Sequence, residues 1–218
     1  LAALGQMASA VAHSLRNPLA NIRSTTELLQ HQHPEIASEA VHDIHGEVDR
    51  MNRHVQELLE YSRSDKVPVQ NVDLTETLRS SLRRMSEGLK RRNIDLVIRS
   101  DKAAMFLVEI DIMMFDHAVS SIVSNAVEAM PGGGTISVVI GERVGKRRAA
   151  VEISDTGKGI PKTLLERLPE PFLTSKTLGL GLGLSLARRI LERFGGSLEL
   201  RSEEGHGTTV ILEIPKAD

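Results

Sequence analysis

Apolar residues recur at alternating spacings of three and four along the first third of the chain. One series consists of Leu1, Leu4, Ala8, Val11, Leu15, Pro18, Ile22, Thr25 and Leu29, and the other of Ala37, Val41, Ile44, Val48, Met51, Val55, Leu58 and Ser62. Heptad series of this kind are typical of helices that pack against other helices. Because only the short turn 31–35 separates them, we predict an antiparallel helical hairpin.

Two helices cannot cover the whole of each other's apolar stripes. We therefore expect the hairpins of two chains to combine into a homodimeric four-helix bundle. The alternative is a monomeric hairpin that packs against the rest of the chain, and the molecular mass in solution distinguishes these two arrangements.

The heptad pattern stops near residue 64, and the remainder of the chain mixes helical and strand patterns. Residues 65–72 show no sustained period, so we predict a helical domain at 1–64, a linker at 65–72 and a second domain at 73–218. The second domain is predicted to contain helices at 73–92, 111–130 and just before 195, and strands at 94–99, 105–110, 135–142, 149–154, 197–202 and 208–214. The fold class is therefore α+β, a helical hairpin followed by a two-layer α/β sandwich.

Composition restricts the kind of partner that such a chain can have. Lys and Arg number 27 against 29 Asp and Glu, which leaves no strong field to attract nucleic acid or an anionic membrane. The absence of cysteine excludes disulfides and thiolate metal sites. No apolar run approaches the roughly 18 residues of a membrane span. We expect neither nucleic-acid binding nor membrane contact by this segment.

His13 is the first candidate for chemistry. It occupies the outermost heptad position between Val11 and Leu15, so its imidazole is expected to face solvent. A neutral imidazole is a nucleophile at neutral pH. Asn17 lies one turn later on the same face, and Pro18 removes a helical hydrogen bond beside it. From these residues alone, an ordinary surface histidine remains the alternative. The other histidines form no convincing metal set.

Three polar or glycine-rich segments follow one another in the second domain. They are Ser-Asn-Ala-Val-Glu-Ala-Met at 124–130, Asp-Thr-Gly-Lys-Gly at 155–159 and Gly-Leu-Gly-Leu-Gly-Leu at 179–184. Each alone is compatible with a turn or a flexible loop. Together they suit a nucleotide, because glycines before a helix N-terminus let phosphate approach the backbone. Asp155, at the end of a buried strand, can accept from an exocyclic amine, and the side-chain oxygen of Asn125 suits Mg²⁺.

With these segments the chain resembles the cytoplasmic kinase core of bacterial two-component sensor histidine kinases. Residues 12–19, Ala-His-Ser-Leu-Arg-Asn-Pro-Leu, resemble the phosphoacceptor box, and residues 111–129 resemble the asparagine box. The two glycine boxes correspond to 155–159 and 179–184, and the phenylalanine box corresponds to Glu-Pro-Phe and Thr-Ser-Lys within 170–176. The resemblance covers nearly the whole chain, and five motifs in the family's order make it specific.

The resemblance implies an ATP-dependent protein-histidine kinase, with the ATP-binding fold shared with gyrase, mismatch-repair and heat-shock-chaperone ATPases. It implies that His13 accepts the phosphoryl group, that Asn17 assists it, that Asn125 holds Mg²⁺ and that Asp155 reads the adenine amine of ATP. The other nucleotide-binding positions that it implies are Gly157, Gly159, Lys176, Gly179, Gly181 and Gly183. It also implies a lid at 162–178, a homodimer and a response-regulator receiver as partner. The implied location is cytoplasmic, with any membrane anchor of the full-length protein upstream of this segment.

Four residues depart from the family pattern. Ser14 follows the histidine where an acidic residue is common, which puts general-base help, worth about 10²–10⁴-fold, in doubt. The alternative function is therefore a catalytically weak, pseudokinase-like dimeric scaffold that binds a receiver, with or without nucleotide. Ser121 stands where Asn is common, His117 where Gln is common and Glu128 where a basic residue is frequent. Because related hydrolases carry their catalytic Glu at the place of Ser121, a phosphotransferase is favoured over an ATPase.

Overall fold

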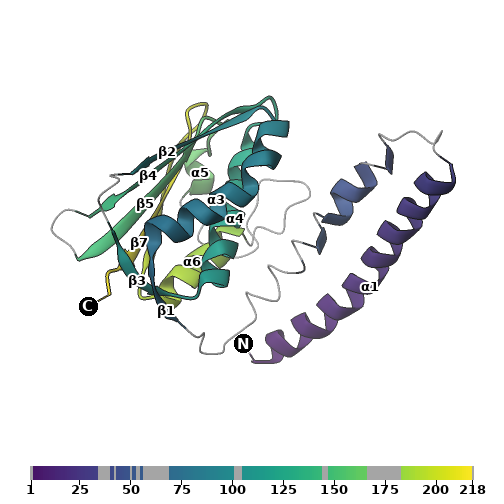
Figure 1. The fold of residues 1–218 in the computed structure, drawn as a ribbon, viewed down its shortest axis with the longest axis horizontal. Helices are drawn as coiled ribbons and strands as arrows, with labels where there is room; N and C mark the ends of the chain where they lie inside the picture. The colour runs from purple at the N-terminus through teal and green to yellow at the C-terminus, as the bar shows by residue number, and fades with distance from the viewer. Residues whose placement is uncertain are drawn as a thin grey trace. The chain divides into compact units, whose positions relative to one another are not determined.

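The computed structural model describes residues 2–33, 40–41, 43–49, 51–52, 55, 69–100, 105–143, 147–165 and 183–217, with only the backbone for 2–14 and 164. The chain divides into two compact units, Leu1–Lys66 and Val67–Asp218. Figure 1 shows a helical first unit and a second unit built from a sheet and helices. No helix within the described ranges combines the length and the hydropathy that crossing a lipid bilayer requires.

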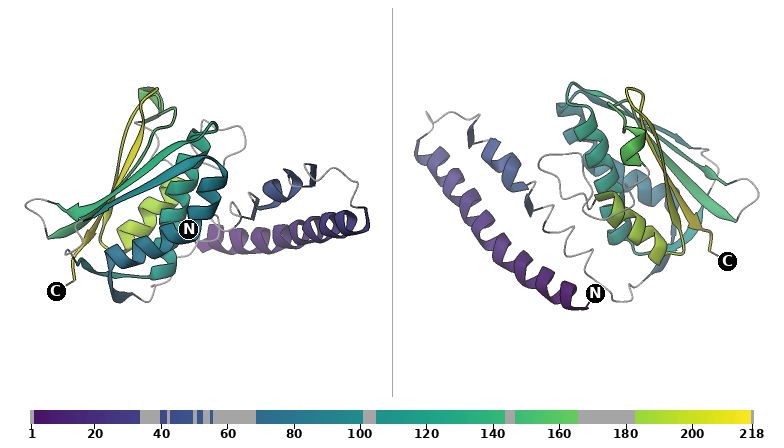
Figure 2. Two further views of the ribbon diagram at one scale, coloured as in Figure 1. Left: turned by 45° about the horizontal axis from the view of Figure 1, so that its top comes forward. Right: turned by 180° about the vertical axis from the view of Figure 1, so that it is seen from behind.

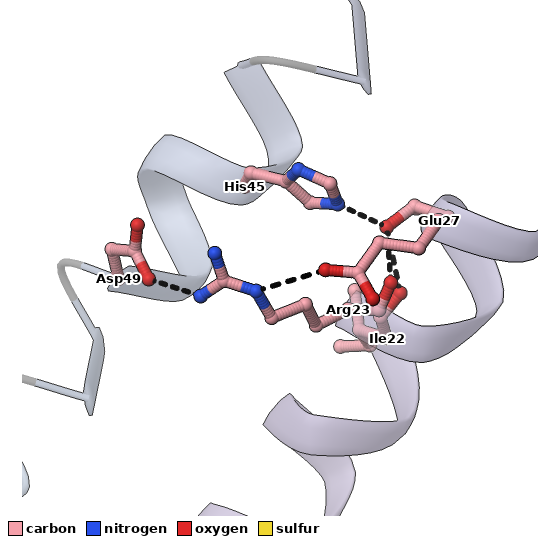
Figure 3. Close-up of polar contacts among 6 residues, drawn as sticks. Ile22, Arg23, Glu27, His45 and Asp49 are labelled. Carbon is pink, nitrogen blue, oxygen red and sulfur yellow. Dashed lines mark hydrogen bonds and ion pairs between the residues drawn. The ribbon is translucent and has the colours of Figure 1, made fainter. Parts of the chain in front are cut away.

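The first unit is the predicted antiparallel helical hairpin. Helix α1 spans Ala2–Gln32 without interruption at Pro18, and helical backbone returns at 40–41, 43–49 and 51–52. Arg23 of α1 donates to Asp49 on the second helix (Figure 3). The later residue Thr26 is bonded to the earlier residue His45. Since positions that ascend along α1 meet positions that descend along the second helix, the two helices run antiparallel.

Thr26 joins the two helices through its hydroxyl group. Its Oγ1 lies 2.9 Å from the carbonyl oxygens of Ile22 and Arg23 and 2.8 Å from Nε2 of His45. A hydroxyl group has one hydrogen, so when that hydrogen points to the carbonyl groups, Nε2 of His45 must be the donor to Thr26. The side chain of Thr26 is only 8% exposed, which makes this bond part of the hairpin interior.

The apolar stripes of the hairpin divide into a buried side and an exposed side. The residues buried between the helices are Leu19, Thr26, Val41, Val48 and Val55. On α1 the buried residues are Leu19 and Thr26, each one position after a member of the predicted series. The second helix therefore covers only one edge of the predicted stripe. The members of the two series that remain 40–47% exposed are Leu15, Ile22, Leu29, Ile44 and Met51.

The second unit is the predicted two-layer sandwich. Its helices are α3 (Leu74–Arg91), α4 (Ile112–Ala129), α5 (Lys162–Leu165) and α6 (Gly183–Arg193). Its strands are β1 (Gln70–Asp73), β2 (Ile94–Ser100), β3 (Leu107–Ile110), β4 (Gly134–Glu142), β5 (Arg148–Asp155), β6 (Ser197–Glu203) and β7 (Gly207–Pro215). The main sheet has the order β2-β4-β5-β7-β6, in which only β2 and β4 are parallel, and α3, α4 and α6 cover one of its faces (Figures 1 and 2).

Local sequence signals explain where the long helices begin. Asp73 caps α3 by accepting a hydrogen bond from the backbone N–H of Thr75 at 3.0 Å. Asp111 caps α4 in the same way, accepting from Met114 at 2.9 Å. Such caps satisfy N–H groups that have no partner within the helix. The core then forms between α4 and alternate residues of the strands, with Phe115 fully buried.

Strand β1 was not predicted. It lies partly within the range 65–72, which carries no sustained period, and it pairs antiparallel with β3 from Gln70 opposite Ile110 to Asp73 opposite Leu107. A strand of four residues shows too little alternation to be recognised from sequence. Its partner lies far away along the chain, so this two-stranded sheet is fixed by tertiary pairing.

Candidate functional site

Asp155 ends β5 with one carboxylate oxygen held by the backbone. Its Oδ1 accepts hydrogen bonds from the N–H groups of Gly157 at 2.8 Å and Thr208 at 3.3 Å. Its Oδ2 has no hydrogen-bond partner among the described residues. Burial raises the pKa of the Asp155 carboxyl group, and the two N–H donors partly oppose that rise. The side chain is therefore fixed in orientation and presents one free acceptor oxygen.

The glycine loop after Asp155 packs against the end of α4. A Cβ atom at Gly157 would lie only 2.7 Å from the Cβ atom of Ala129, and the N–H of Lys158 donates to the carbonyl oxygen of Ala129 at 3.2 Å. Asn125 lies one turn before Ala129 on the same side of α4 and is half-buried. The loop and the helix end thus bring Asn125 within one helical turn of the segment that follows Asp155.

The far side of the loop is fixed by the turn between β6 and β7. The N–H of Ile160 donates to Oγ of Ser202 at 2.9 Å, and the N–H of Gly205 donates to the carbonyl oxygen of Lys158 at 2.8 Å. Gly159 has a φ of 65°, and a Cβ atom there would lie 1.9 Å from the carbonyl oxygen of Glu203. Only glycine fits this position without moving backbone.

Replacing Gly159 with Ala is expected to destabilise the second unit by at least about 2 kcal/mol, because it combines a left-handed φ with a backbone clash. The measurement is the free energy of unfolding in urea, followed by a probe in the second unit. The matched control is Gly205→Ala, since a Cβ atom at Gly205 meets nothing within 4 Å although its φ is 82°. An equal loss in both variants would mean that φ, and not the contact with Glu203, sets the cost.

Helix α4 carries a polar strip beside its core face. Its buried apolar residues include Phe115, Val119 and Ile122. Ser121 precedes Asn125 by one turn and is 8% exposed, and its Oγ has no hydrogen-bond partner in the described part of the chain. Glu128 on the next turn is exposed. The helix therefore presents hydroxyl, amide and carboxylate groups on consecutive turns.

The predicted site residues fall into three groups in the structure. Asn125, Asp155, Gly157 and Gly159 are brought together at the end of α4, and Gly183 is the first residue of α6. Lys176, Gly179 and Gly181 lie outside the described residues, as does the predicted lid beyond α5. His13 lies within α1 with its side chain outside the described part, and Asn17 of the same helix is exposed.

Sequence reasoning missed the contribution of β7. Gly207 has a φ of 87°, and a Cβ atom there would lie 2.0 Å from the carbonyl oxygen of Asp155. Strand pairing then places Thr208 opposite Asp155, where its N–H reaches Oδ1. The sequence analysis predicted the strands 197–202 and 208–214 and assigned no site residue to either of them. The closely spaced Gly205 and Gly207 before two threonines were the available signal.

Comparisons with known proteins agree with this fold. Residues 110–218 match the family described as "Histidine kinase-, DNA gyrase B-, and HSP90-like ATPase". Residues 3–67 match the family described as "His Kinase A (phospho-acceptor) domain". A two-layer ATPase-type sandwich after a phosphoacceptor hairpin defines the class of two-component signalling kinases. The chain belongs to the histidine kinase family.

The chain is similar to sensor kinases along its whole length. It is 32% identical to the sensor histidine kinase ZraS of Salmonella typhimurium over 99% of this chain and 46% of that protein. The catalytic domain of histidine kinase ThkA is 30% identical, with a TM-score of 0.61 over 69% of this chain and 97% of that one. ThkA in complex with the response regulator TrrA gives a TM-score of 0.69 at 29% identity, over 98% and 62% of the two chains. The chain spans about half the length of the curated relatives it matches.

Proposed function

We propose that this chain is the core of an ATP-dependent protein-histidine autokinase that phosphorylates His13 and passes the phosphoryl group to an aspartate of a response-regulator receiver. The observation that carries the proposal is the arrangement of Asp155, the glycine loop and Asn125 at one end of α4. The proposed domains are 1–64 for phosphotransfer and dimerisation, 65–72 as linker and 73–218 for ATP binding. The matches to a phosphoacceptor family at 3–67 and to an ATPase family at 110–218 support the roles of the first and second domains.

The residues present fit Mg-ATP. Oδ2 of Asp155 accepts from none of the described residues and can accept from the adenine amine, and the Asn125 amide oxygen is a ligand that Mg²⁺ prefers. Gly157 and Gly159 let the loop pack closely against Ala129 and Glu203. Gly183 begins α6, whose N-terminus suits phosphate, and the motif adds Lys176, Gly179 and Gly181. Bound Mg²⁺ supplies charge neutralisation for the phosphate oxygens.

His13 is the proposed nucleophile. Its neutral imidazole forms a P–N bond to the γ-phosphorus as the P–O bond to ADP breaks, and the other ring nitrogen releases its proton. Ser14 offers a hydroxyl group instead of a carboxylate to help remove that proton, which predicts slow transfer. Asn17, exposed one turn later, is a polar group in reach of the same face of α1.

The proposed assembly is a homodimer formed by the hairpin. The exposed flank of the apolar stripes is the surface that a second copy would cover, and it consists of Leu15, Ile22, Leu29, Ile44 and Met51. If this surface of one hairpin packed against the same surface of a second copy, the two hairpins would form a four-helix bundle. A receiver is the proposed second partner, in keeping with the solved complex of ThkA with TrrA. We place the segment in the cytoplasm, where receivers reside.

Labelling with γ-labelled ATP and Mg²⁺ tests the proposal. We expect the chain to acquire a label that is lost in acid and kept in alkali, because a P–N bond to imidazole hydrolyses in acid. Asn125→Ala should lose the label, since the metal would lack its protein ligand. An acid-stable label, or full labelling of Asn125→Ala, would contradict the assignment. The scaffold alternative predicts no label in either protein, and none of the comparisons supports it.

A further inference from the structure

Ser121 is a buried hydroxyl group that the described protein leaves unused. It lies in the middle of α4, 8% exposed, and its Oγ has no hydrogen-bond partner among the described residues. Serine in a helix is commonly satisfied by donating to the carbonyl oxygen four residues earlier, which here belongs to His117, and this bond is not made. A buried polar group without a partner costs stability, and an alanine would avoid that cost.

The position of Ser121 points to what could satisfy it. Ser121, Asn125 and Ala129 follow one another at single-turn spacing, so they lie along one side of α4. That side ends at the glycine loop, where Ala129 contacts Gly157 and accepts from Lys158. Ser121 is thus the next polar group behind Asn125 on the strip that faces the proposed nucleotide site.

We propose that Ser121 is a positioning residue for the metal end of the nucleotide site, with its Oγ bound to a water molecule of the Mg²⁺ hydration shell. This inference rests on the proposed function. Mg²⁺ keeps several waters when protein supplies few ligands, and a metal-bound water is a strong donor. The side chain of Ser121 is shorter than that of Asn125, the proposed direct ligand of Mg²⁺. A water molecule between Oγ of Ser121 and the metal would make up for the shorter reach. The hydroxyl can accept from that water.

The expected consequence is a loss of affinity that depends on the metal. The experiment uses isothermal titration calorimetry of the full chain with a non-hydrolysable ATP analogue, in Mg²⁺ and in EDTA. Ser121→Ala should bind the analogue about three- to tenfold more weakly in Mg²⁺, the range expected for one net hydrogen bond. In EDTA the native and variant chains should bind equally. The melting temperature of the nucleotide-free variant should be unchanged or higher.

Thr75 provides the matched control. It is a second buried hydroxyl group whose Oγ1 has no partner in the described residues, and it lies in the first turn of α3. Thr75→Val removes that hydroxyl group at nearly constant shape and should leave analogue affinity unchanged in both buffers. An unchanged affinity of Ser121→Ala in Mg²⁺, an equal loss in EDTA, or the same loss in Thr75→Val would overturn the inference. Failure of the native chain to bind the analogue at all would overturn the proposed function itself.

Discussion

Replacing His13 with Gln is expected to reduce labelling from γ-labelled ATP to background, about 10⁴-fold or more below the native chain. The amide nitrogen of glutamine is not nucleophilic, because its lone pair is delocalised into the carbonyl group. Glutamine is otherwise well tolerated in a helix, so α1 should persist. The measurement is incorporation of label per chain over time at saturating Mg-ATP.

His31 supplies the control for this experiment. It lies on the same helix, is exposed, and differs from His13 in standing outside the phosphoacceptor motif. His31→Gln should label as the native chain does. The His13→Gln chain should still bind nucleotide with native affinity, because the proposed nucleotide residues belong to the second unit. Acid-labile label that persists in His13→Gln would place the acceptor on another residue.

Much of the fold could be predicted because its signals are local. Asp73 and Asp111 each precede an apolar-periodic run, and both cap the helices that they were expected to begin. The alternation along 149–154 predicted a strand, and β5 forms there. The five motifs predicted the family, because each one matches a single segment of the chain and together they occur in the family's order.

What could not be predicted depends on contacts between distant segments. Strand β1 exists because β3 pairs with it, and Thr208 reaches Asp155 because β7 pairs with β5 in one register. On α1 the heptad pattern predicted a stripe through Pro18 and Thr25, whereas the buried residues are Leu19 and Thr26, because burial there depends on where the second helix packs. The lack of a hydrogen-bond partner for the Ser121 hydroxyl group among the described residues is likewise invisible in sequence, because it depends on the groups that surround Ser121.

The raised pKa of Asp155 links the proposed recognition of adenine to the stability of the fold. Burial raises the pKa of this carboxyl group above 3.8, so the folded chain binds the proton more tightly than the unfolded chain does. Stability from this group is therefore present at low pH and is lost as pH rises through the folded pKa. At neutral pH the ionised Asp155 costs the nucleotide-free fold free energy, and an amine that donates to Oδ2 offsets part of that cost.

Asp155→Asn should therefore separate stability from recognition. The side-chain oxygen of Asn can keep the bonds from Gly157 and Thr208, while the new NH₂ group replaces Oδ2 and faces the adenine amine donor to donor. We expect ATP affinity to fall on the order of 10²-fold or more. The melting temperature of the nucleotide-free chain at pH 7 should be unchanged or higher, because the buried charge is gone.

The same substitution should change the choice of base. An NH₂ group at position 155 can donate a hydrogen bond to the 6-oxo group of guanine. The ratio of ATP affinity to GTP affinity should therefore be lower in Asp155→Asn than in the native chain, and a change of pH should not restore it. The matched control is Asp111→Asn, which keeps the cap on α4 and should leave both affinities unchanged. If Asp155→Asn bound ATP as the native chain does, the carboxylate would have no part in reading adenine. The free Oδ2 would then have to serve another donor.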